Sequence, residues 1–143
     1  MIVYRLTRKR AEYLSGKGAY QVGGRWNSKG VYMLYTAESL VLAKCEVARH
    51  VNFEDIPDDY VVLEIEIPDD SVCVVDKIPE NWNADPPDVV TKEMGDRFVE
   101  REDCIALKVP SVCDENSFNY LLNPQHPEYK LKVKLVKELP FEI

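Results

Sequence analysis

The segment YVVLEIEI at residues 60–67 is the feature that most limits how this chain can fold. Its second half alternates apolar and acidic residues, which is the period-two pattern of a strand with one buried face. Pro68 and two aspartates follow and end the strand. Further strands are predicted at residues 1–6, 31–35, 104–109 and 131–136.

Two helices are predicted between these strands, one from Ala37 to about Val51 and one over residues 91–101. Thr36 stands where the first helix needs an N-cap. Residues 14–30 hold five of the six glycines and are expected to be irregular, and residues 114–129 to be loop-rich. Because strands outnumber helices in a mixed order, the sequence predicts a single α+β domain over residues 1–143, with mixed, largely antiparallel sheets and a few helices.

Charge and cysteine spacing exclude several classes of protein. The net charge is -7, with 18 basic and 25 acidic residues, which argues against direct binding of nucleic acid. No apolar run approaches the roughly 20 residues of a membrane span, and the chain enters a strand pattern at once, so we expect a cytoplasmic protein without a signal peptide. The four cysteines lack metal-ligand spacing and are expected to be reduced, mostly core residues: Cys45, Cys73, Cys104 and Cys113.

Glu46 lies on the first predicted helix, which is apolar nearly all round. A carboxylate on a largely buried helix costs several kcal/mol unless a partner meets it. Helix phase places Ser39 and His50 on the same stripe, where they would orient Glu46. This geometry alone favours a structural pair with an arginine, and a catalytic role needs further polar residues in unusual places.

The sequence supplies such residues, although each one alone favours a structural role. Arg25 lies in GGRWN (23–27), and its guanidinium suits a diphosphate or a carboxylate. Tyr35 ends a predicted strand, and Ser111 follows one directly. Asn119 and His126 lie in the loop-rich segment, where the NPQHP turn favours a structural hydrogen bond for His126.

Taken in order along the chain, these motifs resemble the RES-domain family, the toxin half of Xre–RES toxin–antitoxin pairs. The matching segments are VYRL (3–6), GKGAYQVGGRWNSKG (16–30), YTAESLVLAKCEV (35–47), YVVLEIEIP (60–68), Trp82 with a T…GD segment (91–96), VPSV (109–112) and NYLLNPQHPEY (119–129).

The resemblance implies a bacterial toxin with a fold like that of ADP-ribosyltransferase toxins. Such a protein would degrade NAD+, its substrate rather than a permanently bound cofactor, by cleaving the nicotinamide–ribose bond as a glycohydrolase or a phosphorylase. A protein mono-ADP-ribosyltransferase with the same site is the alternative, and a non-catalytic binding module is the second. The implied partner is an Xre-type antitoxin with a helix-turn-helix domain, and a homodimer within that complex stays open.

The resemblance also assigns roles to single residues. Glu46 and Arg25 would be catalytic, with Glu46 stabilising a ribosyl cation and Arg25 holding the diphosphate. The residues implied to bind NAD+ are Arg5, Arg25, Tyr35, Ser111 and Asn119. The candidates for supporting Glu46 from behind are Ser39, His50 and His126, and no metal is required.

Overall fold

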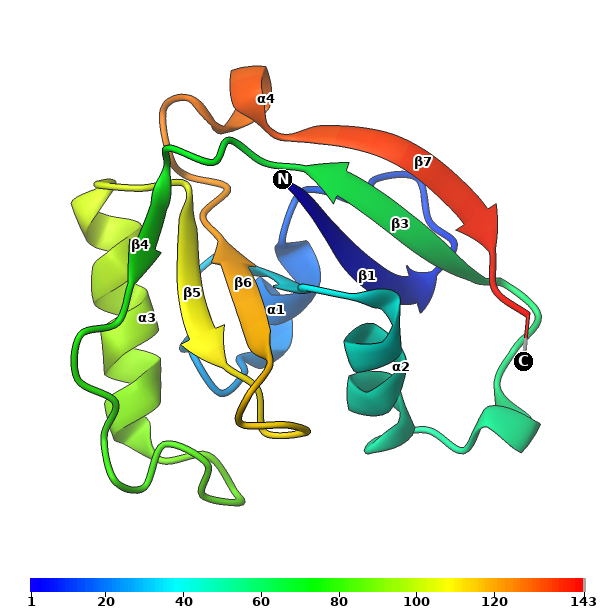
Figure 1. Ribbon diagram of the computed structural model, residues 1–143, viewed down its shortest axis with the longest axis horizontal. Helices are drawn as coiled ribbons and strands as arrows, with labels where there is room; N and C mark the ends of the chain where they lie inside the picture. The colour runs from blue at the N-terminus through cyan, green and yellow to red at the C-terminus, as the bar shows by residue number, and fades with distance from the viewer. Residues whose placement is uncertain (143) are drawn as a thin grey trace.

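The computed structural model describes residues 1–142, which form a seven-stranded sheet with helices packed on it (Figure 1). Ile143, the last residue of the predicted domain, lies outside the described residues. The strand order is β4-β5-β6-β2-β1-β3-β7. The strands are β1 (Ile2–Arg8), β2 (Leu34–Ala37), β3 (Tyr60–Glu66), β4 (Val72–Val74), β5 (Ala106–Pro110), β6 (Phe118–Leu122) and β7 (Lys134–Pro140). The helices are α1 (Lys17–Val22), α2 (Leu40–Ala48), α3 (Val89–Arg101) and α4 (Tyr129–Lys132), with a 3-10 turn at Phe53–Asp55.

The strand predicted most firmly from the sequence lies inside the sheet. β3 pairs with β1 from Ile2↔Glu66 to Arg8↔Tyr60 and with β7 on its other side. Its inward residues Leu63 and Ile65 are fully buried, as the alternation predicts. Each pair of neighbouring strands is antiparallel except β4 and β5, which are parallel. The predicted mixed, largely antiparallel α+β fold is therefore confirmed.

The sheet is joined most weakly between β1 and β2. Their register contains a single pair, Tyr4↔Ala37, whereas β2 and β6 share four pairs. On one side of this junction β4, β5 and β6 run at an angle to β1, β3 and β7 on the other side, so the sheet has two halves (Figure 1). α2 begins at Leu40, shortly after β2 ends, and so lies at this junction.

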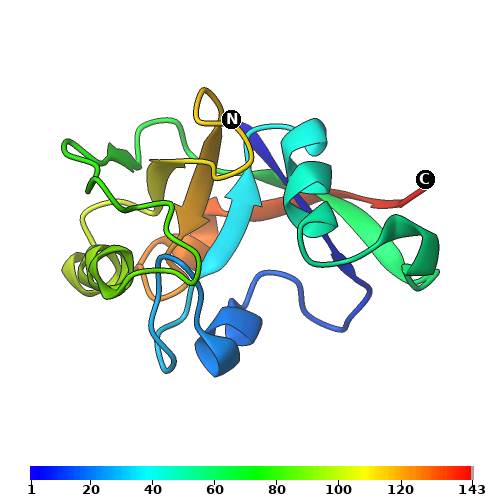
Figure 2. The same ribbon diagram turned by 90° about the horizontal axis from the view of Figure 1, so that it is seen from below.

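Different helices cover the two halves of the sheet. α3 places Phe98 in a buried cluster with Val109 of β5, whereas α2 places Leu42 in a cluster with Leu6 of β1. Figure 2 shows α3 beside the β4–β5 end and α2 beside the β1–β3 end. The junction between the halves is thus flanked by helices that can carry polar groups into it.

The N-terminus of α2 differs from the prediction. Ser39, rather than Thr36, is the N-cap: its Oγ accepts a hydrogen bond from the Leu42 N–H at 3.1 Å. Thr36 belongs to β2 and donates its hydroxyl to the Tyr120 carbonyl at 2.6 Å. Pairing with β6 holds the backbone extended through Ala37, so the helix cannot begin there.

The expectation of a largely buried helix at α2 is also wrong. Val41 is 77% exposed and Cys45 is exposed, and the buried residues of α2 are Leu42 and Ala43. Glu38 and Arg49 lie at the solvent edge as predicted. The apolar composition of α2 led to the wrong prediction because α2 packs on the sheet through one narrow face only.

Local patterning missed the short elements. α1 lies within the glycine-rich segment, and α4 spans the boundary between the predicted loop-rich segment and the predicted last strand. β6 lies in the loop-rich segment, and β4 lies where no strand was predicted. β6 has the sequence FNYLL, which does not alternate, and it is fixed by pairing with both β2 and β5. Tertiary pairing of this kind overrides local propensity.

Two of the four cysteines are bonded to each other. Cys73 and Cys104 form a disulfide with a Cα–Cα distance of 5.8 Å, so the expectation of four reduced cysteines is wrong for this pair. The parallel register of β4 and β5 places Cys73 opposite Leu107 and so beside the start of β5, which their 31-residue separation conceals. Cys45 and Cys113 are free thiols. Within residues 1–142, no helix is long and apolar enough to cross a membrane.

Candidate active site

A cleft of about 820 Å³ opens where the two halves of the sheet diverge. Its size lies within the usual range of ligand pockets. β1, β2, α2, β6 and the loop at residues 23–26 all contribute walls. Five of the residues expected to be catalytic or to bind NAD+ line it: Arg5, Arg25, Tyr35, Glu46 and Asn119. Segments far apart in the sequence are thus brought together at one cavity.

Glu46 reaches the cleft from the inner face of α2. Its Oε2 accepts a hydrogen bond from the Ser111 hydroxyl at 3.1 Å. Burial raises the pKa of Glu46 above its ordinary value, while Asn119, Ser111 and the more distant Arg49 oppose this shift. The structure therefore provides an acid with a raised pKa, facing a cavity and held by neutral donors.

Ser111 supports Glu46 from behind instead of lining the cleft. It follows β5 directly and is 1% exposed. Its Oγ accepts from the Cys113 N–H at 3.1 Å and donates to Glu46. The hydroxyl is thus occupied on both sides, and its contact is with the carboxylate.

Asn119 lies on β6 opposite Ala37 and lines the cleft next to Glu46. Its Nδ2 donates to the Thr36 carbonyl at 3.1 Å. This bond fixes the amide plane beside the carboxylate whose ionised form it helps to stabilise.

Arg5 is a partly buried cation of the site. Its Nη1 donates to the Tyr35 carbonyl at 2.8 Å, which links β1 to β2 beside their single backbone pair. Burial, reinforced by the neighbouring Arg10, lowers the pKa of Arg5 to about 10. Guanidinium remains charged at neutral pH, and its remaining N–H groups are available to an anion in the cleft.

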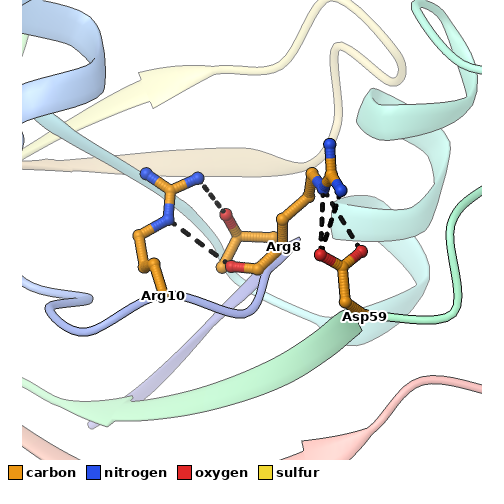
Figure 3. Close-up of polar contacts among 4 residues, drawn as sticks. Arg8, Arg10 and Asp59 are labelled. Atoms are coloured by element: carbon orange, nitrogen blue, oxygen red, sulfur yellow. Dashed lines mark hydrogen bonds and ion pairs between the residues drawn. The ribbon is translucent and has the colours of Figure 1, made fainter.

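Arg10 stands beside Arg5 and was not among the predicted site residues. Its Nη2 donates to the Thr7 hydroxyl at 3.2 Å, and its Nε donates to the Arg8 carbonyl at 3.4 Å (Figure 3). Arg8 itself turns away and binds Asp59 through Nε and Nη2, as Figure 3 also shows. A smaller cavity of about 30 Å³ beside the cleft is lined by both Arg5 and Arg10. The basic run at residues 5–10 is the signal in the sequence that could have indicated this pair.

Arg25 is anchored to the loop that precedes α3. Its Nη1 donates to the carbonyls of Trp82 and Ala84 at 3.0 and 2.7 Å. Burial, followed by repulsion from Arg49, lowers its pKa. One nitrogen of the guanidinium therefore ties residues 82–84 to the rim of the cleft, which Arg25 also lines.

Tyr35 braces the loop that carries Arg25. Its hydroxyl donates to Asn27 Oδ1 at 2.7 Å and accepts from the Trp26 N–H at 2.9 Å. Burial raises its pKa, so the phenol stays protonated. A Cβ on Gly24 would lie 2.6 Å from this hydroxyl, which explains why a glycine stands there.

α3 holds the other side of the same loop. Thr91 donates to the Arg25 carbonyl at 2.6 Å, and Lys92 binds the Gly24 carbonyl. Asp96 accepts from both the N–H and the hydroxyl of Ser28. Gly95 lies against the Trp26 carbonyl, where an added Cβ would be 1.6 Å away. The T…GD segment of α3 therefore fixes the loop at residues 23–27, which carries Arg25.

The three residues predicted to support Glu46 do not form hydrogen bonds with it among the described residues. Ser39 caps α2 through the Leu42 N–H. His50 is exposed beyond the end of α2 and lines the cleft. His126 accepts from the Glu128 N–H through Nδ1 at 3.0 Å, within its own turn. Ser111 and Asn119 take the supporting position instead, because β5 and β6 bring them to the carboxylate.

The arrangement suits stabilisation of positive charge next to a bound anion. Glu46 offers a fixed carboxylate at the cleft, and Arg5 and Arg25 offer guanidinium groups to the same cleft. A carboxylate placed where a cation develops lowers the energy of that transition state, and guanidinium forks bind phosphate oxygens. No cluster of three or more His, Cys, Asp or Glu side chains arranged to hold a metal ion occurs among residues 1–142.

Comparisons of sequence place the chain among known proteins. A family model described as RES domain matches residues 2–143. Toxin Res of Photorhabdus laumondii is 37% identical, over 100% of this chain and 94% of that protein. Toxin Res of Yersinia enterocolitica is 33% identical, over 99% and 95%. The Prs ADP-ribosylating toxin of a Sphingobium species is 36% identical, over 90% and 83%.

A solved structure has the same fold. The fold is similar to that of a chain in the crystal structure of the M. tuberculosis MbcT–MbcA toxin–antitoxin complex, with a TM-score of 0.77. The sequence identity is 17%, and the match covers 98% of this chain and 83% of that chain.

Proposed function

The chain belongs to the RES-domain family, and we propose that it is the toxin of a toxin–antitoxin pair that cleaves the nicotinamide–ribose bond of NAD+. The observation that carries this proposal is the Glu46 carboxylate, which faces an 820 Å³ cleft beside Arg5 and is held by Ser111 from behind.

Glu46 acts on the reacting ribose. Departure of neutral nicotinamide leaves positive charge on the ribose, in a transition state that resembles an oxocarbenium ion. The leaving group needs no strong acid, and an ionised carboxylate next to the ribose is the group that helps most. The hydrogen bonds from Ser111 and Asn119 favour that ionised form in a buried setting.

The arginines act on the diphosphate. Arg5 lines the cleft with one guanidinium nitrogen bound to the Tyr35 carbonyl, while Arg25 lines the rim with one nitrogen bound to the 82–84 loop. Arg10 raises the positive potential next to Arg5. We therefore assign the main diphosphate contact to Arg5, with Arg25 shaping the 82–84 loop at the rim of the cleft.

The first test is product analysis with NAD+ labelled in the adenosine. In hydrolysis, water adds to the ribose carbon and the products are nicotinamide, ADP-ribose and a proton. In phosphorolysis, phosphate adds and gives ADP-ribose 1″-phosphate. We expect nicotinamide release with label in one of these two products, and the presence of phosphate decides which. Intact NAD+ after prolonged incubation with folded protein would contradict the proposal.

One comparison favours a second acceptor for the ADP-ribosyl group, namely a side chain of a target protein. The Sphingobium relative is named an ADP-ribosylating toxin and is similar over 90% of this chain. A side chain of a target protein would then attack the same ribosyl cation in place of water. Incubation with labelled NAD+ and a bacterial lysate separates the two: label bound to protein indicates the transferase, and label in small molecules indicates the degrading enzyme.

The proposed partner is an Xre-type antitoxin. The similar M. tuberculosis chain was solved in a toxin–antitoxin complex, which supports an antitoxin for this chain. We expect the antitoxin to suppress NAD+ loss when the two are mixed. Failure of NAD+ to bind in a calorimetric titration, with no growth arrest on expression, would favour a non-catalytic binding module instead.

A further inference from the structure

Two free thiols flank the contact between Glu46 and Ser111. Cys45 precedes Glu46 on α2, and Cys113 lies two residues after Ser111 on the connection between β5 and β6. Cys45 is exposed and Cys113 is partly buried. The proposed cleavage of NAD+ uses neither thiol, and the Cys73–Cys104 disulfide involves neither.

Hydrogen bonds and packing bring the two thiols together. The Cys113 N–H donates to Ser111 Oγ at 3.1 Å, and Ser111 Oγ donates to Glu46 at 3.1 Å. Cys113 also packs against the buried cluster that contains Leu42 of α2, and Leu42 lies three residues, about one turn, before Cys45. Cys45 is next to Glu46 in the chain, so both thiols adjoin the Glu46–Ser111 contact, and the Cys45 side chain is near enough to contribute to the raised pKa of Cys113.

The two thiols differ in reactivity. Burial first, and then the contact with Cys45 and the charge of Glu46, raise the pKa of Cys113 to about 12. Cys113 therefore stays protonated at neutral pH, and an external reagent meets the exposed Cys45 first. Because the thiolate is the nucleophile in disulfide exchange, Cys45 is the residue that can begin such a reaction.

We propose that Cys45 and Cys113 form a redox-active dithiol site that small-molecule disulfides, such as oxidised glutathione, convert into an intramolecular disulfide. The Cys45 thiolate attacks one sulfur of the reagent, forms a mixed disulfide and releases one thiolate. Cys113 then loses its proton to solvent and attacks the Cys45 sulfur, and the second thiolate leaves. In total, two protein thiols lose two electrons and two protons, and one reagent disulfide becomes two thiols.

The bond would link α2 directly to the β5–β6 connection, across the contact that holds Glu46. It would close a long loop of chain between elements that otherwise touch through one hydrogen bond and a small apolar cluster. Crosslinks of this kind stabilise proteins, and we expect a rise in Tm on the order of 5 °C on oxidation.

The test follows the two thiols by mass spectrometry after incubation of the folded protein with oxidised glutathione. Cys113→Ser removes the resolving thiol and should trap glutathione on Cys45. The wild-type protein should instead lose both free thiols, yield a linked peptide that contains Cys45 and Cys113, and carry roughly tenfold less bound glutathione than Cys113→Ser. Cys45→Ser should leave Cys113 unmodified.

Three results would overturn the proposal. The first is stable glutathione on Cys45 in the wild-type protein to the same extent as in Cys113→Ser. The second is no loss of either thiol, and the third is a link from Cys45 or Cys113 to Cys73 or Cys104. The Cys73–Cys104 disulfide is shared by every variant and serves as the internal reference. None of these readouts depends on NAD+ turnover.

Discussion

Replacing Ser111 by alanine tests whether its hydroxyl holds the Glu46 carboxylate in its active form. The Ser111 hydroxyl donates to Glu46 Oε2 at 3.1 Å, and it is one of the two neutral side chains, with Asn119, that oppose the effect of burial on this acid. A hydrogen bond to a charged group contributes about 1.5–3 kcal/mol. Because the Glu46 side chain is partly exposed, we expect a contribution at the low end of this range. A free energy of 1.36 kcal/mol corresponds to one pKa unit.

The direction of the expected pH shift follows because the ionised form of Glu46 is the active form. The pKa of Glu46 is already raised, so turnover begins to fall at a higher pH than it would with an ordinary glutamate. Loss of the Ser111 donor destabilises the carboxylate further and raises the pKa again. We expect the acid limb of the pH profile of NAD+ consumption to move upward by about one unit in Ser111→Ala.

Ser39→Ala is the matched control. Ser39 caps α2 and does not touch Glu46, so its loss should cost about 1 kcal/mol of stability without moving the acid limb. An acid limb that stays in place in Ser111→Ala, or moves equally in both variants, would refute the role assigned to Ser111.

Two further changes probe the diphosphate contact assigned to Arg5 and the packing of α3 against the loop that carries Arg25. Arg5→Gln should raise KM for NAD+ by roughly 10- to 100-fold, because it removes charge-assisted hydrogen bonds to the diphosphate. Arg8→Gln, which affects an exposed pair with Asp59, should change KM less than about twofold; equal KM values in steady-state assays would contradict this. Gly95→Ala should lower the free energy of unfolding by about 3 kcal/mol, since its Cβ would collide with the Trp26 carbonyl. Gly18→Ala, whose added Cβ would have its nearest neighbour 3.9 Å away, should leave the free energy of unfolding unchanged or raise it by about 0.5–1 kcal/mol. Equal stabilities of the two variants in thermal or urea unfolding would contradict the predicted clash at Gly95.

Sequence patterning was sufficient where local chemistry decides the structure. The alternation in residues 60–67 predicted β3, and the helix predicted over residues 91–101 forms most of α3. The sequence motifs also indicated the residues that meet at the cleft, including Arg25, Tyr35 and Glu46.

The partners of these residues could not be predicted, because they depend on the order of strands in the sheet. Ser111 meets Glu46 across 65 residues of sequence, and Arg25 binds carbonyls 57 and 59 residues away. The contact of Asn119 with Glu46 could not be predicted either, because it depends on the pairing of β6 with β2. Helix phase could suggest Ser39 and His50 as neighbours of Glu46, but it could not show where α2 begins and ends.

The most direct test of the proposed NAD+ chemistry is NAD+ consumption by Glu46→Gln. Glutamine keeps the shape of the side chain and can still accept the hydrogen bond from Ser111, but it carries no charge. We expect unchanged binding to the antitoxin, a Tm within a few degrees of wild type, and a loss of turnover of about 10²- to 10³-fold or more. Glu38→Gln, an exposed acid just before α2 that accepts from the Phe118 N–H, should retain turnover. Undiminished NAD+ consumption by a folded Glu46→Gln protein would contradict the proposal that this carboxylate stabilises the ribosyl cation.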